Sequence, residues 1–254
     1  MTAAQPGDNG VTDDALLGGR VRLAQPASGY RAAIDPVLLA AAVAARAGER
    51  VLDAGAGVGA ASLCLAARVA GCRIVGVERD SALVALFERN IAANGFGDRV
   101  SALAGDIAEP LPALAPGAFD RVMINPPYLT AEAADAPPDA GRAAAMVEDA
   151  VDLAAWLDFG LAMVRRKGTL TVIHRADRLD ALLAALYGRA GAVAVLPLWP
   201  KAGQAARRVI VAARKGIGGP ARLLPGLVLH EPGGAYTAEA EAVLRGGGAL
   251  DLAG

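Results

Sequence analysis

Short apolar runs of strand type alternate with longer helical stretches from about residue 50 of this 254-residue chain. Such alternation is typical of α/β folds, in which helices cover both faces of a mostly parallel sheet. We therefore predict a doubly wound, mostly parallel seven-stranded sheet. The predicted strands are Arg50–Ala54, Arg73–Glu78, Val100–Ala104, Phe119–Ile124, Thr169–His174, Ala192–Leu196 and Arg207–Ala213. The helices between them are predicted to begin near Gly59, Asp80, Asp106, Val147 and Ala176.

Capping signals predict where several helices begin and end. Asp35, followed by Pro36 at the first helical position, predicts the N-cap of an early helix over Pro36–Arg46. Asn94-Gly95 predicts a left-handed C-cap on the second helix of the core. Near the C-terminus, LVLHE predicts a last strand, and Thr237 predicts the N-cap of a short helix that ends near Arg245.

These signals divide the chain into four parts. Residues 1–15 contain several Gly, Asp and Asn residues and are expected to be disordered. Residues 16–48 are expected to form an N-terminal lid segment, and residues 49–215 the core, with a loop at Thr130–Arg142 over the carboxyl edge of the sheet. Residues 216–254 are expected to form a C-terminal extension of one strand and one helix.

Composition argues against a membrane or secreted protein. Apolar residues make up 54% of the chain, but no apolar run approaches the roughly 20 residues that span a bilayer. The first residues lack the positive and apolar segments of a secretory signal, which predicts a cytoplasmic protein. Cys64 and Cys72 match neither a metal nor a disulfide pattern, so we expect reduced thiols and no metal site. His174 and His230 are expected to pack or cap.

The run VLDAGAGVGAAS over residues 51–62 is typical of a strand, a glycine turn and the start of a helix. Gly55 and Gly57 allow the backbone to approach a ligand closely. The spacing alone also passes as a dinucleotide-binding fingerprint, and a turn without a ligand is a further interpretation.

Three acidic residues stand at the ends of three successive predicted strands and favour one cofactor. Asp53 stands where it would repel a pyrophosphate, whereas S-adenosylmethionine carries an ammonium and a sulfonium that favour an acidic rim. Glu78 can accept hydrogen bonds from both ribose hydroxyls. Asp106 can accept from the adenine amine while Ile107 packs on the ring, although Asp106 is also a plausible N-cap. The pattern favours S-adenosylmethionine.

Asn125-Pro126-Pro127-Tyr128 follows the fourth predicted strand directly, and its two prolines hold a rigid extended turn. The Asn125 side-chain oxygen and the Pro126 carbonyl can accept the two N–H bonds of an amine or amide whose lone pair is delocalised. Accepting both bonds localises the lone pair and aims it at a methyl donor. Tyr128 offers a face for stacking. The motif predicts nitrogen methylation.

The glycine loop, Glu78, Asp106 and NPPY together resemble the amino-methyltransferases of the seven-strand, Rossmann-like class I type. Within that class, GYRAAIDPVLLAAAV over residues 29–43, the strand RRVIVAARKG and the tail LVLHEPGGAYTAEAEAVL resemble bacterial tRNA adenine-N6 methyltransferases that modify the anticodon loop of a valine tRNA. The resemblance covers roughly residues 16–245 and implies tRNA processing that yields N6-methyladenosine.

The resemblance also implies roles for individual residues. It places Tyr30, Arg31 and Asp35 on a lid near the methionine end of the cofactor. It assigns S-adenosylmethionine binding to Asp53, Gly55, Gly57, Glu78 and Asp106. It assigns the target amine to Asn125, Pro126, Pro127 and Tyr128.

A tRNA partner would have to be bound by local basic clusters, because the net charge is −1 at pH 7. Three clusters are candidates: Arg165-Arg166-Lys167, Arg207-Arg208 and Arg214-Lys215. Each is also typical of a solvated end of a helix or strand. Lys201 and Gln204 are placed to reach substrate from a loop before the last core strand, and we expect a monomer or weak dimer.

Other functions remain open at this stage. A release-factor glutamine methyltransferase uses the same NPPY chemistry, although its family carries a helical domain ahead of the glycine loop and only about fifty residues precede the loop here. An rRNA amino-methyltransferase and a small-molecule methyltransferase also remain. A non-catalytic RNA-binding or cofactor-binding protein is disfavoured by the intact Asn125, Pro126 and Tyr128.

Overall fold

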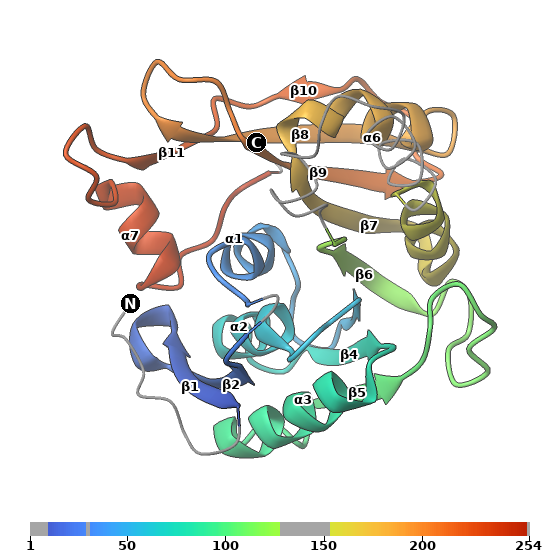
Figure 1. The fold of residues 1–254 in the computed structure, drawn as a ribbon. Coiled ribbons are helices and arrows are strands. Elements are labelled where there is room, and N and C mark those ends of the chain that lie inside the picture. The colour runs from blue at the N-terminus through green and yellow to red at the C-terminus, as the bar shows by residue number, and fades with distance from the viewer. Residues whose placement is uncertain (1–9, 29–30, 128–152, 253–254) are drawn as a thin grey trace, which may run out of the picture.

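The computed structural model describes residues 10–28, 31–127 and 153–252. A nine-stranded sheet forms the centre, with strand order β10-β8-β9-β7-β6-β3-β4-β5 and with β11 also paired to β8 (Figure 1). Its strands are β3 (Arg50–Ala54), β4 (Arg73–Glu78), β5 (Val100–Ala104), β6 (Phe119–Ile124), β7 (Val164–Arg175), β8 (Ala190–Lys201), β9 (Arg208–Lys215), β10 (Arg222–Leu223) and β11 (Leu227–His230).

The predicted seven-stranded sheet is confirmed as β3 to β9, and the four strands β3 to β6 have the predicted bounds. All neighbours among these seven are parallel except those of β9, which runs antiparallel to β7 and β8. The C-terminal extension adds β10 and β11 at the β8 edge of the sheet.

Helices cover both faces of the sheet. These helices include α1 (Asp35–Ala42), α2 (Ala60–Arg68), α3 (Ser81–Asn94), α6 (Leu179–Leu186) and α7 (Ala238–Leu244), with short 3-10 turns at Leu17–Gly19 and Ala176–Arg178. Residues 153–163 are also helical. One buried cluster joins α1, α2 and α7 to the sheet, and a second joins residues 153–163 and α6 to the opposite face. Among the described residues, no helix is long and apolar enough to cross a bilayer.

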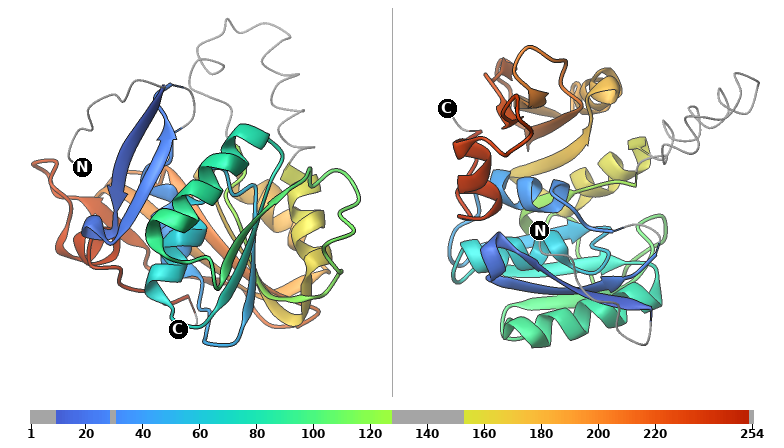
Figure 2. Two further views of the ribbon diagram at one scale, coloured as in Figure 1. Left: turned by 90° about the horizontal axis from the view of Figure 1, so that it is seen from below. Right: turned by 60° about the vertical axis from the view of Figure 1, so that its left-hand side comes forward.

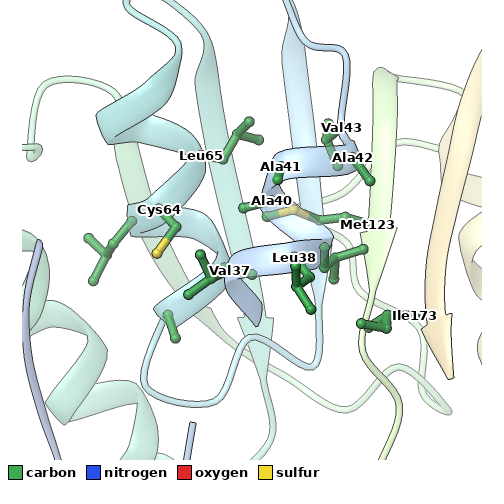
Figure 3. Close-up of a cluster of buried hydrophobic side chains, with 14 of the residues drawn as sticks. Val37, Leu38, Ala40, Ala41, Ala42, Val43, Cys64, Leu65, Met123 and Ile173 are labelled. Carbon is green, nitrogen blue, oxygen red and sulfur yellow. The ribbon is translucent and has the colours of Figure 1, made fainter. Parts of the chain in front are cut away.

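Alanine allows α1 and α2 to pack closely under the sheet. Ala40, Ala41 and Ala42 of α1 are buried beside Leu65 of α2, and Met123 of β6 lies in the same cluster (Figure 3). Short side chains let helix axes approach more closely than leucine would. The high apolar content of the chain is therefore used in buried helix faces, as the composition predicted.

Two capping predictions, at Gly95 and Thr237, and the predicted helix start at Asp80 are confirmed. The Asp80 carboxylate accepts hydrogen bonds from the backbone N–H groups of the first turn of α3, at Ala82 and Leu83. Gly95 closes the same helix with φ 68°, and the hydroxyl of Thr237 accepts the N–H of Ala240 at the start of α7. Local hydrogen bonding at these positions depends only on neighbouring residues, which is why the sequence predicts it.

Three local predictions are wrong. Asp35 is the first residue of α1 and does not cap it, because its carboxylate pairs with Arg208 at 3.1 Å. No helix follows Asp106: its side chain accepts the N–H of Ala108 in a turn, and Pro110 and Pro112 then interrupt the backbone hydrogen bonds that a helix needs. Residues 11–15, expected to be disordered, lie in a strand.

That strand belongs to an N-terminal hairpin of β1 (Val11–Leu16) and β2 (Val21–Pro26), which lies along α3 (Figure 2). Two asparagines of α3 bind the backbone of β2. Buried Asn90 accepts the N–H of Ala24 at 2.7 Å and donates to the carbonyls of Ala24 and Val58 at 2.9 and 3.0 Å. Asn94 bonds both backbone groups of Arg22 in the same way nearer the surface.

Asn90→Ala should lower the free energy of unfolding by about 2–4 kcal/mol, because it leaves buried backbone groups of Ala24 and Val58 without partners. The matched variant Asn94→Ala should cost about 1 kcal/mol or less, since water can replace its bonds. Urea unfolding of both variants measures the difference. Equal losses in the two variants would contradict the anchoring role of Asn90.

Candidate active site

A cleft of about 250 Å³ opens at the carboxyl ends of β3 and β6. From β3 the chain continues outward on one side to β4 and β5, and it then crosses to β6 on the other side of β3. The order of strands therefore reverses between β3 and β6. Ligands of doubly wound sheets bind in the crevice at this point. The cleft is lined by Pro26, Ser28, Ala32, Pro36, Asp53, Gly55, Ala56, Gly57, Val58, Ala60, Ala61, Asp80, Leu83 and Asn125.

The glycine turn between β3 and α2 needs glycine for packing as well as for conformation. Gly55 has φ 71°, and a Cβ there would lie 2.5 Å from the ring of Trp156. Gly59 has φ 85°, and a Cβ there would lie 2.0 Å from the ring of Phe87 on α3. Both positions therefore exclude larger residues on two independent grounds. Trp156 thus packs directly against the backbone of Gly55.

Asp53 forms the acidic floor of the cleft. Its side chain is only 2% exposed, and one carboxylate oxygen accepts hydrogen bonds from the Ser62 hydroxyl at 2.7 Å and the Ser62 backbone N–H at 3.1 Å. Burial raises the pKa of Asp53 from 3.8 to about 6, although both Ser62 bonds oppose the change. A cationic ligand beside this carboxylate would stabilise its charged form.

Glu78 connects the glycine turn to the end of β4. One of its carboxylate oxygens accepts the N–H of Gly57 and the other accepts the N–H of Asp80, each at 2.9 Å. Asp106 lies at the same edge of the sheet, because the N–H of the preceding Gly105 donates to the Glu78 carbonyl. Ile107 packs partly buried against the core. The structure thus aligns these residues along the carboxyl edge, but only Asp53 of the three acidic residues lines the cleft.

Asn125 joins the cleft through the parallel pairing of β3 with β6. Ala54 pairs with Ile124, so Gly55 and Asn125 leave adjacent strands at the same level, and Asn125 lines the cleft together with Gly55 and Asp53. Pro126 is buried and Pro127 is exposed. Tyr128, the fourth residue of the predicted motif, lies outside the described residues.

Two of the three predicted lid residues, Arg31 and Asp35, do not line the cleft. Arg31 donates to the Asp14 carboxylate at 2.7 Å, to the Thr12 hydroxyl and to the Pro26 carbonyl, which fastens the chain to the hairpin. Asp35 lines a second cavity instead. Tyr30 lies outside the described residues.

Sequence reasoning missed several residues of the cleft. Pro26 and Ser28 come from the end of the hairpin, and the Gly18-Gly19 pair at its turn was the signal that could have predicted it. Asp80 and Leu83 come from the start of α3. The sequence predicted Asp80 as the start of a helix, only two residues after Glu78. That short spacing was the signal that could have placed Asp80 at the cleft.

The three basic clusters are divided between two opposite edges of the sheet. Arg208 pairs with Arg175 at the carboxyl end of β7, on the side of the cleft. Arg214 pairs with Thr169 instead, and six residues of strand separate these two pairs, which is about 20 Å. Arg165-Arg166-Lys167 also lies at the amino-terminal start of β7. Only Arg207-Arg208 therefore shares an edge with Asn125.

Comparisons with known proteins agree with this geometry. Residues 32–153 match the methyltransferase small domain family. A crystal structure from Agrobacterium tumefaciens, described as a predicted O-methyltransferase, is 27% identical and superposes with a TM-score of 0.70 over 85% of this chain and 98% of its own. This chain has the class I methyltransferase fold. The predicted fold class is confirmed.

Two curated relatives share this methyltransferase region. The tRNA1(Val) (adenine(37)-N6)-methyltransferase of Porphyromonas gingivalis is 32% identical over 143 residues, which are 55% of this chain and 55% of that protein. A release factor glutamine methyltransferase of Geobacter sulfurreducens is 38% identical over 79 residues, 31% of this chain and 26% of that protein. The match thus spans about half the length of the first relative.

Within the described residues, no group of His, Cys, Asp and Glu side chains could hold a metal ion.

The raised pKa of Asp53 predicts how Asp53→Asn changes stability with pH. The native state holds this proton more tightly than the unfolded chain, so the contribution of Asp53 is full below pH 3.8 and is lost as pH rises through about 6. Relative to wild type, the variant should gain about 2–3 kcal/mol in the free energy of unfolding between pH 4 and pH 8. Chemical denaturation at both pH values measures this gain, and a difference that does not change with pH would contradict it.

Proposed function

We propose that this methyltransferase transfers a methyl group from S-adenosylmethionine to a nitrogen, and that the favoured acceptor is the N6 amine of an adenine in tRNA. The position of Asn125 carries the proposal. Its strand register places it beside Gly55 at the mouth of a cleft with a carboxylate at its floor. An amide that accepts hydrogen bonds and an acidic cofactor cleft are thereby neighbours.

The residues of the cleft fit S-adenosylmethionine. Asp53 supplies a buried negative charge for a cationic ligand, and the Glu78 oxygens keep lone pairs for hydroxyl donors beyond the Gly57 and Asp80 bonds. We propose that Gly55, Gly57, Asp106 and Ile107 complete this binding site. When bound, the cofactor supplies a methyl group on a positively charged sulfur.

Asn125 and Pro126 hold the acceptor in this proposal. The Asn125 side-chain oxygen and the Pro126 carbonyl accept the two N–H bonds of the amine, which keeps its lone pair directed toward the methyl group. The proton that leaves the nitrogen after transfer passes to solvent, so no general base is required. Pro127 holds the turn rigid, and Tyr128 is proposed to stack on the acceptor base.

An oxygen acceptor, which the name of the Agrobacterium structure suggests for that protein, fits less well. A hydroxyl has one hydrogen to donate, whereas Asn125 and Pro126 offer two acceptors. Glutamine of a release factor is the second candidate, because the Geobacter relative acts on that residue type and an amide has the same two N–H bonds. The longer match to the tRNA enzyme favours adenine.

The tRNA substrate agrees with other features of the chain. A cytoplasmic location follows from this substrate, and buried Cys64 and Cys72 are both free thiols, as expected in a reducing compartment. Arg207 and Arg208 provide positive charge at the edge that carries Asn125. We further propose that the hairpin and α1 together form the N-terminal cover of the cofactor cleft.

Asn125→Ala should lower kcat about 100- to 1000-fold, because it removes an acceptor that orients the amine. The dissociation constant of S-adenosylmethionine should change less than about threefold, since the Asp53 and Glu78 charges remain. Turnover is measured with unmodified tRNA, and cofactor binding by calorimetry. Full activity in the variant would contradict the mechanism, and equal loss of cofactor binding would show that Asn125 serves the cofactor instead.

A further inference from the structure

A second cavity of about 300 Å³ lies next to the cofactor cleft. It is bounded by the start of α1, the ends of β8 and β11 and the start of β9. Leu38, Leu198 and Leu229 give it apolar walls, while Arg207, Arg208 and His230 add polar edges. Neither the cofactor nor the acceptor nitrogen uses this cavity in the function proposed above.

The two cavities share a wall. Ala32 and Pro36 line the cofactor cleft, whereas Ala33, Ile34 and Asp35 between them line the second cavity. Across the sheet, β9 lies two strands from β6, so Arg208 and Asn125 are separated by about 10 Å in that direction. A polymer whose reacting group rests at Asn125 can therefore place a neighbouring unit in the second cavity.

The charges at this cavity favour an anion. The Asp35 carboxylate is already paired with Arg208, with Nε to Oδ2 at 3.1 Å, so it offers little net negative charge. The guanidinium of Arg207 is exposed and makes no salt bridge within the described residues. Its backbone is held on both sides, because its N–H donates to Leu198 and its carbonyl accepts from Ala176. The side chain thus extends from a fixed position at the cavity rim.

The remaining chemistry suits a nucleotide. The ring of His230 is stacked on Tyr236 with centroids 4.7 Å apart, and its Nδ1 lies 3.1 Å from the Gly234 carbonyl, so the ring is held in place. Apolar walls beside a fixed ring can receive a sugar or base, and an arginine at the rim can bind a phosphate.

We propose that this second cavity binds the nucleotide that flanks the methylated adenine, with Arg207 on its phosphate. The proposal rests on the tRNA function proposed above and extends it to a specific contact. It also predicts that the basic clusters at the other edge, about 20 Å away, contribute nothing specific to binding.

The test compares Arg207→Ala with Arg166→Ala. Both arginines are exposed and form no salt bridge within the described residues, but Arg166 lies at the opposite edge of the sheet. The probe is a fluorescent, unmodified RNA stem-loop with the sequence of a valine tRNA anticodon arm, and anisotropy is recorded over a range of salt concentrations. Arg207→Ala should weaken binding about tenfold and reduce the slope of log K against log salt by about one. Arg166→Ala should bind as wild type does.

Three results would overturn the inference: wild type that does not bind the RNA, Arg207→Ala that binds as well as wild type, or equal weakening in both variants. Calorimetry with S-adenosylmethionine, unchanged in both variants, shows that each variant is folded. Because this test measures RNA binding and not methylation, failure of the inference can be distinguished from failure of the proposed function. RNA bound through Arg207 without methylated adenine would reject only the function, and methylated adenine with unchanged binding by Arg207→Ala would reject only the inference.

Discussion

The parallel register between β3 and β6 is the constraint on which the candidate site depends. Pairing of Ala54 with Ile124 brings the glycine turn and Asn125 out of the sheet at the same level, although about 70 residues separate them in the chain. A slip of one residue would move the side chains of the shifted strand to the opposite face of the sheet, which the buried residues on both faces strongly oppose. The hydrophobic core thereby fixes the position of Asn125 relative to the glycine turn and the cleft.

Three side chains outside β3 and β6 hold the glycine turn in place. Phe87 of α3 packs where Gly59 has no side chain, and Trp156 packs in the same way on Gly55. Asn90 binds the turn at the Val58 carbonyl and the hairpin at Ala24. One buried amide therefore connects the N-terminal hairpin to the glycine turn, and residues remote in sequence hold that turn in position.

The sequence predicted the features that short-range patterns determine. Apolar runs predicted the core strands. The helix start at Asp80 and the caps at Gly95 and Thr237 were predicted because each of these residues bonds only to its own helix. It did not predict contacts that depend on distant partners. Asp35 has the local sequence of an N-cap, but its carboxylate pairs instead with Arg208, which is 173 positions away in the chain. The hairpin was missed because the Asn90 and Asn94 hydrogen bonds that hold it come from α3. The separation of the basic clusters was missed because it depends on how β7 and β9 pair.

The most direct test of the central claim is to locate the transferred methyl group. Purified protein is incubated with methyl-labelled S-adenosylmethionine and unmodified tRNA, with a release factor offered in a parallel reaction, and the products are digested and analysed by mass. The account predicts label in N6-methyladenosine from the tRNA, and incorporation at least about 100-fold slower with the Asn125→Ala variant. Label on an oxygen or carbon atom, or no transfer to either acceptor, would contradict it.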